Sequence, residues 1–156
     1  MPVRKKILTR IEEIQEIIDN SSVCYLAMSD NNKPYVVPMN FGYQDGIFYF
    51  HGGDFGKKLA ILRKNPQVSI SLVSESKLHK RHEEVACSYS MLYKSVVAQG
   101  EVVFENDPHL KRKYLNIIMK QYTGKDDFEY NDPAVNNVIV FFVKVYKITA
   151  HLRMNM

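Results

Sequence analysis

The sequence of 156 residues has no tryptophan, only two cysteines, seven glycines and six prolines. The scarcity of glycine and proline excludes collagen-like and low-complexity chains. Cys24 and Cys87 lie in separate segments, and because no signal peptide precedes them we expect free thiols. A disulfide-stabilised secreted domain is therefore not expected.

Several patterns that would assign a function class are also missing. No apolar run approaches the ~18 residues that a membrane span needs, and no apolar segment follows the basic residues 1–10. We therefore expect a cytoplasmic protein that neither spans nor binds a membrane. The net charge of +4, from 21 Lys and Arg against 17 Asp and Glu, favours anionic ligands weakly and is not typical of nucleic-acid binding. No Gly-x-Gly-x-x-Gly pattern indicates a nicotinamide-binding domain.

The residues that are abundant indicate one β-rich domain over residues 1–156. Hydrophobic residues make up 46% of the chain, and ten Tyr and eight Phe favour strands. Periodicity predicts three helices, over residues 11–19, 55–64 and 108–122. Alternation and turn residues predict six strands, over residues 23–28, 35–43, 47–51, 67–72, 95–104 and 138–152. Strands in hairpin-like order with short added helices favour an antiparallel barrel.

Local signals refine these elements. Thr9 and Glu12 fit a capping box at the first helix, and Asp107 followed by Pro108 fits the start of the third. Pro38 cannot donate to a sheet ladder, so its strand should lie at an edge or carry a bulge. A plain edge proline, or one that frees neighbouring backbone groups for a ligand, would both satisfy this pattern.

The segment 74–84 is polar and charged, and we expect a solvated loop there, or a lid over the site. His79, His82 and Cys87 superficially match metal ligands, but one His-x-x-His pair with one cysteine is a weak pattern, and no metal site is predicted. Cys87 is expected to be a small buried residue near the barrel. Gly100 is expected at a bulge or bend of its strand.

The most informative stretch is an aromatic strand that ends at His51 and is followed by Gly52, Gly53 and a helix that begins with Lys57 and Lys58. Backbone N–H groups, the positive end of a helix dipole and two ammonium groups would then meet at one point. These are the components of an anion site, which suggests a phosphate-bearing cofactor.

Each of these residues also has a simpler interpretation. Lys57 and Lys58 could be a solvated pair, but cations in the first turn oppose the helix dipole, whereas Arg63 and Lys64 in the last turn suit it. This mismatch favours a bound anion. A lone His51 would more simply hydrogen-bond a nearby carbonyl. Beside the glycines and lysines it is expected at a ligand site, where an imidazole can donate or relay a proton.

Three motifs in order resemble one known family. They are residues 34–41, His51 with residues 56–59, and residues 93–100. Together, over roughly residues 7–122, they are similar to the pyridoxamine 5′-phosphate oxidase-like flavin-binding split barrels, and to the branch of 5-nitroimidazole-resistance proteins. The oxidase branch has an arginine where Tyr35 stands here, which argues against oxidation of pyridoxamine phosphate.

The resemblance implies a mainly β, six-stranded antiparallel split barrel that binds FMN, with FAD as the alternative flavin, at a homodimer interface. One strand would lie along the flavin ring, the lysines would reach the phosphate, and His51 would be catalytic. The residues implied to bind the cofactor are Val36, Val37, Pro38, Met39, Asn40, Phe41, His51, Gly52, Lys57, Lys58, Ser95 and Val96.

The leading hypothesis is an FMN-dependent oxidoreductase that reduces small nitroaromatic (5-nitroimidazole-like) or related electrophiles, with His51 donating or positioning a proton. The electron donor would be a reduced nicotinamide or another reduced carrier. One alternative is a non-catalytic flavin- or haem-binding split barrel, in which His51 or His151 could be an axial ligand. A structural interaction barrel is the third hypothesis.

Overall fold

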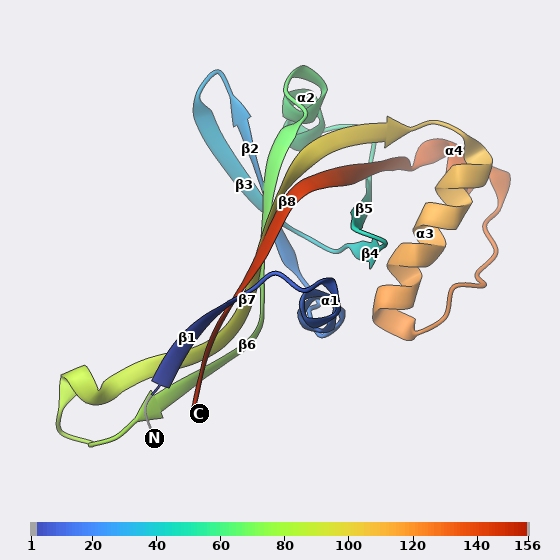
Figure 1. Cartoon of the computed structure of the whole chain (residues 1–156). Helices are drawn as coiled ribbons and strands as arrows, with labels where there is room; N and C mark the ends of the chain where they lie inside the picture. The colour runs from blue at the N-terminus through green and yellow to red at the C-terminus, as the bar shows by residue number, and fades with distance from the viewer. Residues whose placement is uncertain (1–2, 156) are drawn as a thin grey trace.

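The computed structural model describes residues 3–155, which form one antiparallel sheet with four α-helices (Figure 1). Its strands are β1 (Val3–Leu8), β2 (Cys24–Asp30), β3 (Lys33–Met39), β4 (Gly42–Gln44), β5 (Ile47–Gly52), β6 (Gln67–Lys80), β7 (Tyr89–Glu105) and β8 (Ile139–Asn155). Hydrogen-bonded neighbours follow the order β3-β2-β6-β7-β8-β5-β4, and β1 pairs with β8. The two ends, β3 and β4, do not pair, so the barrel is split. The predicted fold class is confirmed, with eight strands instead of six.

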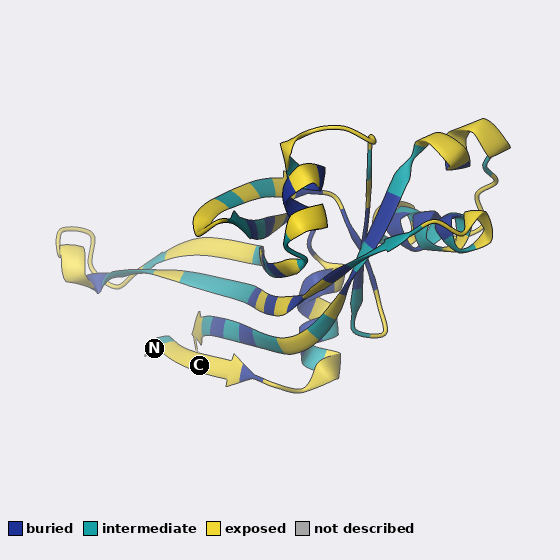
Figure 2. Cartoon of the chain, turned by 90° about the horizontal axis from the view of Figure 1, so that it is seen from above, coloured by how far each residue is buried: buried dark blue, intermediate teal, exposed yellow. Residues whose placement is uncertain are grey.

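The main core lies between the curved sheet and two helices, α1 (Ile11–Asp19) and α2 (Lys57–Lys64). Both helices are amphipathic, and each buries its apolar stripe. Figure 2 shows the buried segments gathered where the strands cross beside these helices. The largest fully buried side chains include Phe41, Phe48, Phe50 and Phe141. We call this part of the molecule, residues 9–73 and 95–151, the body.

Helix α3 (Pro108–Thr123) forms a second, smaller cluster with β5. Ile117 and Ile118 pack there with Tyr49, whose ring lies 4.7 Å from that of Tyr114. The helix begins as predicted, because the Asp107 carboxylate accepts hydrogen bonds from two backbone N–H groups of the first turn. The short helix α4 (Asp132–Asn137) follows. Within residues 3–155 no helix is both long and apolar enough to cross a membrane.

The predicted loop over residues 74–84 is wrong for residues 74–80, which belong to a strand, whereas residues 81–84 do lie in a turn. β6 continues to Lys80 and pairs with β7 as far as Tyr89, so the two strands form a long hairpin that projects from the body (Figure 1). β1 and the end of β8 extend this projection, since Lys5 pairs with Arg153 and Arg153 pairs with Tyr93. We call residues 3–8, 74–94 and 152–155 the arm. Along this hairpin the β6 residues are mostly exposed and the β7 residues mostly half-buried, and none of its apolar residues is fully buried, so it lacks the apolar alternation that would have predicted strands.

Two irregularities interrupt the regular pairing of the sheet, one where β6 passes from body to arm and one within the body. One lies between Val73 and Glu75 on β6, and the other between Gln99 and Gly100 on β7. A Cβ at Gly100 would lie 2.3 Å from the carbonyl oxygen of Lys144 on β8, so only glycine permits this close approach. The predicted bulge at Gly100 is confirmed. Pro38 lies on the edge strand β3, which is also as predicted.

Other local predictions were wrong. The expected capping box at α1 does not form, because the cap residue is Arg10 and no side chain caps the helix. Phe55 precedes α2 and is 84% exposed instead of packing on a helical face. Cys87, expected to be buried, is exposed near the tip of the arm. The predicted strand over residues 35–43 divides into β3 and β4.

Candidate functional site

Helix α2 begins with two lysines and no acidic residue in its first turn. Gly56 is its N-cap and has a φ of 114°, a backbone conformation that side-chain-bearing residues rarely adopt. Because Gly56 has no side chain, it cannot cap the first N–H groups, which the structure leaves without a side-chain acceptor. The helix start is therefore positively charged through both its dipole and its lysines.

Lys58 points from this helix start toward β3 and β5. Its Nζ lies 3.3 Å from the Sδ of Met39 on β3, and a Cβ at Gly52 on β5 would lie 3.8 Å from the same Nζ. A thioether is a weak acceptor, and no carboxylate within residues 3–155 forms an ion pair with Lys58. Burial lowers the pKa of the Lys58 ammonium. A half-buried cation with so poor an acceptor is an unsatisfied group that an anion would stabilise.

Lys57 occupies the neighbouring position and takes a different direction. Its Nζ lies 4.5 Å from the centre of the Tyr35 ring on β3, a cation–π contact. The two lysines and Tyr35 thus connect the helix start to the edge strand. In the sequence, Tyr35 marks only a departure from the oxidase branch, and no pattern predicts its contact with Lys57.

His51 lies near the end of β5, opposite Val140 on β8. Its side chain is exposed in the single chain, yet the surrounding protein partly desolvates it. This burial, and secondly the positive charge of Lys58, lower the pKa of His51 below its usual value. The imidazole is therefore mainly neutral at pH 7. The structure brings His51, Gly52, Met39 and Lys58 together.

The strand expected to contact a flavin presents two different faces. Val36, Pro38 and Asn40 are exposed, whereas Val37 and Met39 turn toward the core. Phe41 is fully buried, so its side chain belongs to the core and not to a surface site.

Tyr122, on α3, accounts for the break between β3 and β4. Its hydroxyl accepts hydrogen bonds from the Phe41 N–H at 3.0 Å and the Asn40 amide at 3.2 Å, and donates to the Ser22 carbonyl at 2.8 Å. The Phe41 N–H thus has a side-chain partner in place of a ladder bond, whereas Asn40 bonds to Tyr122 through its side-chain amide. Tyr122 was not predicted as part of this region, because its contacts span about 80 to 100 residues of sequence.

Ser95 and Val96 lie on β7, away from the lysines. Val96 is buried in the core, and Ser95 lies opposite Val73 and His151, where its hydroxyl is 3.5 Å from the His151 carbonyl oxygen. Two strands, β2 and β6, separate β7 from β3. At a strand spacing of ~4.8 Å, Ser95 is therefore about 14 Å from β3. One chain does not bring Ser95 to Lys58.

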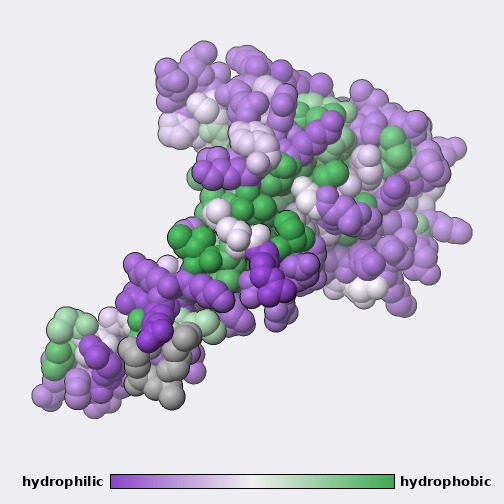
Figure 3. Space-filling model, viewed as in Figure 1, coloured by the Kyte–Doolittle hydropathy of each residue, from purple (hydrophilic) through white to green (hydrophobic). Residues whose placement is uncertain are grey.

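The side of the sheet that faces away from the core is apolar in its centre. Pro38 pairs with Tyr25, Tyr25 with Ser71, and Ser71 with Val97, so these residues form one row across four strands. We call this surface the outer face. Its exposed apolar side chains are Tyr25 at 51%, Val36 at 57%, Val73 at 51% and Val97 at 40%. Figure 3 shows apolar residues gathered over the central strands between polar regions.

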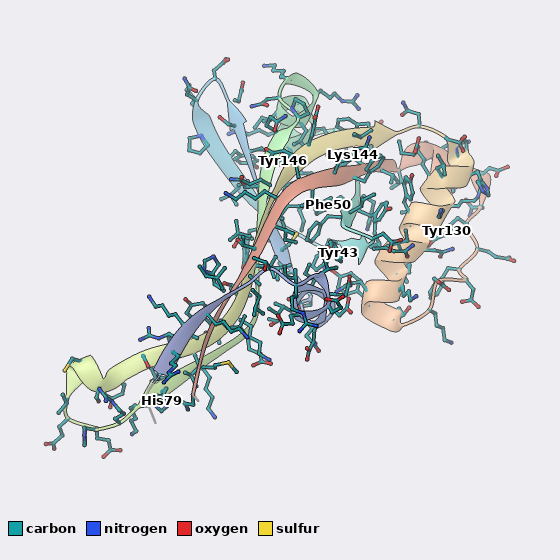
Figure 4. The ribbon with its side chains drawn as sticks, viewed as in Figure 1. Tyr43, Phe50, His79, Tyr130, Lys144 and Tyr146 are labelled. Atoms are coloured by element: carbon teal, nitrogen blue, oxygen red, sulfur yellow. The ribbon has the colours of Figure 1, made fainter. Side chains whose placement is uncertain are left out.

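Metal ligands are not grouped anywhere in residues 3–155: no three His, Cys, Asp or Glu side chains are placed to hold a metal ion. His79, labelled in Figure 4, lies on the arm, as does Cys87 in the short turn before β7, whereas His51 lies on β5 in the body.

These features define the class of the protein. It is a split antiparallel barrel with a positively charged helix start beside its open edge and an apolar outer face. Within this class, residues 10–151 match the pyridoxamine 5′-phosphate oxidase family. Because the match spans most of the chain, the protein belongs to that family, as the three motifs had predicted. A search of curated proteins finds no match.

Solved structures support this assignment. The chain is 38% identical to a proposed 5-nitroimidazole antibiotic resistance protein from Bacteroides thetaiotaomicron, with a TM-score of 0.84, and the match covers 100% of this chain and 93% of that one. An FAD- and heme-binding protein from Mycobacterium smegmatis has a TM-score of 0.84 at 15% identity, over 96% and 74%. The flavocytochrome Anf3 from Azotobacter vinelandii has a TM-score of 0.81 at 15% identity, over 96% and 70%. These last two show a shared fold only.

Proposed function

We propose that this protein is an FMN-dependent oxidoreductase that reduces small nitroaromatic compounds, such as 5-nitroimidazoles, or related electrophiles. The observation that carries the proposal is the Lys58 ammonium, half-buried at the start of α2 with a thioether as its acceptor. Membership of the family and the 38% identical relative support the same cofactor class and substrate class.

The residues at this helix start fit the phosphate of a flavin. A phosphate there would accept hydrogen bonds from the first N–H groups of α2 and from the ammonium groups of Lys57 and Lys58. Both lysines would then be neutralised, and the positive end of the dipole would face an anion. FMN is favoured because its terminal phosphate suits a helix start, and FAD is the alternative.

His51 would lie between this phosphate site and the substrate. The bound flavin supplies the electron chemistry. A phosphate beside Lys58 would cancel part of the positive charge that lowers the pKa of His51, so the imidazole would bind a proton more readily in the loaded protein. In this state His51 could hold a proton near the electrophile through its ring nitrogen.

The site would be completed by a second copy of the chain. Ser95 lies about 14 Å from β3 within one protomer, while the exposed apolar row of the outer face is contiguous with both. A homodimer that buries this row would place Ser95 of the partner subunit near the strand at Val36 and Pro38. Burying the row would also remove apolar side chains from water.

The test is to purify the protein, record its visible spectrum and identify any chromophore released on denaturation. We expect paired flavin bands and released FMN, sedimentation as a dimer at micromolar concentration, and consumption of a nitroimidazole when the flavin is reduced. A Soret band would instead favour the haem-binding alternative. A protein that stays colourless after FMN is added would refute the proposal, and a flavin-loaded monomer would refute the interface site.

His51→Ala separates the two roles of the histidine. If His51 holds a proton, the variant keeps its flavin and reduces the electrophile ~10²–10⁴-fold more slowly. If His51 only positions the flavin, the variant loses flavin while the rate per bound flavin is kept. An effect on neither binding nor rate would remove His51 from the site.

A further inference from the structure

A second cationic site lies on the arm, far from α2. A cavity of about 250 Å³ opens between the tip of the β6–β7 hairpin and the adjoining ends of β1 and β8. Figure 4 labels His79 on this part of the arm, beside the start of β1. The lining residues are Val3, His79, Arg81, Cys87, Ser88, Tyr89, Ser90 and Arg153. None of them is acidic.

Two side-chain nitrogens at this cavity are buried without a hydrogen-bond partner among residues 3–155: the Nε2 of His79 and the Nε of Arg153. The arginine Nε is always a donor, because the guanidinium keeps its charge at any physiological pH. A buried donor without an acceptor is costly, and buried polar groups are nearly always paired in folded proteins. An acceptor supplied from outside the chain would satisfy the Arg153 Nε, and also the His79 Nε2 when that nitrogen carries the proton.

The surroundings favour an anionic acceptor over a neutral one. The arm carries eight Lys and Arg residues against three Glu, although the whole chain has a net charge of only +4. None of the three glutamates lines the cavity, and two of them are paired elsewhere, Glu83 with Lys80 at 2.7 Å and Glu75 with Lys94 at 3.2 Å. Arg81 is exposed at the cavity and unpaired within the described residues, so its guanidinium is available to a ligand.

The hydrogen-bond donors that remain free at the cavity also limit the choice of ligand. The Ser88 hydroxyl is fully used, because it accepts from the His82 N–H and donates to the His82 carbonyl. The donors that remain are two guanidinium groups, an imidazole and the Ser90 hydroxyl. Planar guanidinium groups match the oxygens of a phosphate, and several of them together are typical of phosphate recognition.

We propose that this cavity binds the phosphate or pyrophosphate group of a small ligand, at a site separate from the proposed flavin site. Arg153 and His79 would bind the inner oxygens, and Arg81 would bind those nearest the opening. The volume allows a pyrophosphate or a phosphate with a small attached group, and it is below the range typical of drug-sized ligands.

Calorimetric titration with inorganic phosphate and with pyrophosphate tests the proposal. We would use the full chain carrying Lys57→Met and Lys58→Met, which removes the other cationic site whether or not that site binds a flavin. We expect saturable binding that weakens with added salt. Arg153→Gln should lower the affinity by about 10-fold or more, as should Arg81→Gln, the range for losing one charged hydrogen bond.

The matched control is Lys113→Gln, which removes one exposed positive charge from α3. Its affinity should equal that of the parent. Arg81→Gln keeps the test decisive if Arg153→Gln does not fold, because the Arg81 side chain is exposed. Absence of binding at millimolar phosphate or pyrophosphate, or equal affinity in all three variants, would overturn the proposal.

Cys87 provides an independent readout, because its exposed thiol lines the cavity. Cys24 is buried, and burial raises the pKa of its thiol to about 12, so only Cys87 should react with a thiol reagent. Pyrophosphate should slow the labelling of Cys87 in the parent protein and in Lys113→Gln. Equal labelling rates with and without pyrophosphate would contradict the placement of the ligand at this cavity.

Discussion

The body and the arm are parts of one sheet, but different interactions stabilise them. In the body, the strands curve around a core in which Phe41, Phe48, Phe50 and Phe141 have no exposed surface. On the arm, backbone ladders are equally continuous, yet Leu78 is 59% exposed and no apolar residue of the hairpin is fully buried. Ladder hydrogen bonds fix the path of the chain, whereas burial of apolar side chains supplies most of the free energy of folding.

Charge follows the same division. With eight Lys and Arg against three Glu, the arm accounts for the whole positive excess of the chain. A two-stranded hairpin without an apolar face is at best marginally stable alone. The stability of the arm therefore depends on its pairing with β8, on the pairing of β8 with β1, and on any bound ligand or second chain. The body has a hydrophobic core that stabilises it. The arm has none, and its cationic surface is better explained by contact with a ligand or another chain.

The contrast between body and arm would be wrong if a substitution in the core and one on the arm lowered the free energy of unfolding equally. Phe50, labelled in Figure 4, stacks on Phe141, and the two ring centres lie 5.2 Å apart. Phe50→Ala should lower the free energy of unfolding by about 3–5 kcal/mol, because it leaves a cavity in a closed core. Leu78→Ala should cost less than about 1 kcal/mol, since most of the side chain is already in water. Urea unfolding measures both.

The control for Phe50→Ala is Phe55→Ala, which removes an equal side chain that is 84% exposed. It should leave the midpoint of unfolding nearly unchanged. If Leu78→Ala proved as costly as Phe50→Ala, the arm would carry buried contacts, most simply with a second chain. Repeating the measurement at several protein concentrations would identify such an interface.

Within the body, the first and last turns of α2 can be compared through their lysines. Lys58→Met should weaken flavin binding by about 1–3 kcal/mol, the range for losing a charge-assisted hydrogen bond. The same change should stabilise the flavin-free protein by about 0.3–1 kcal/mol, because a cation no longer opposes the helix dipole. Fluorescence titration with FMN and thermal unfolding without it measure these opposite signs.

Lys64→Met is the matched control, since Lys64 lies in the last turn of the same helix, where a cation suits the dipole. It should leave flavin affinity unchanged and slightly destabilise the flavin-free protein. Unchanged affinity in Lys58→Met would mean that the helix start is not the phosphate site.

The sequence predicted the body far better than the arm, for a physical reason. Strands with one buried face alternate between apolar and polar residues, so the regions of β2, β5 and β8 were recognised from pattern alone. The distal parts of β6 and β7 have no buried face and therefore no alternation, and the charged residues 74–84 resembled a loop. β1 was missed for the same reason, because Arg4, Lys5 and Lys6 interrupt its apolar residues.

The candidate site was predictable where it depends on neighbours in sequence. The glycines after His51 and the lysines at the start of α2 lie within eight residues, and their chemistry was evident from the sequence. The bonds of Tyr122 to Asn40 and Phe41, and the contact of Met39 with Lys58, depend on tertiary packing. Periodicity carries no information on such pairs.

The N-termini of α1 and α3 show that a local sequence pattern predicts a helix cap correctly in one case and wrongly in the other. Asp107 accepts two backbone hydrogen bonds at the start of α3, whereas Thr9, the predicted cap of α1, makes none. Asp107→Ala should therefore lower the free energy of unfolding by about 1 kcal/mol. Thr9→Ala should change it by less than about 0.5 kcal/mol. Chemical denaturation measures the difference, and equal costs would show that the Thr9 cap forms in solution.

The smallest expected effect concerns the acid side of the stability profile. Burial and the charge of Lys58 lower the pKa of His51 in the folded state, while the unfolded chain keeps a pKa near ~6.5. Above this pH the imidazole is neutral in both states and contributes nothing. As the pH falls below it, the unfolded state binds a proton that the folded state resists, so the free energy of unfolding decreases until the lowered pKa is passed.

His51→Gln should therefore flatten the loss of stability between pH ~6.5 and the lowered pKa of His51. Because the His51 side chain is itself exposed, solvent screening keeps the effect small. FMN should reduce it further if its phosphate neutralises Lys58. Parallel pH profiles for the parent and His51→Gln would show that Lys58 does not act on His51, and the proposed coupling between the phosphate site and the histidine would have to be abandoned.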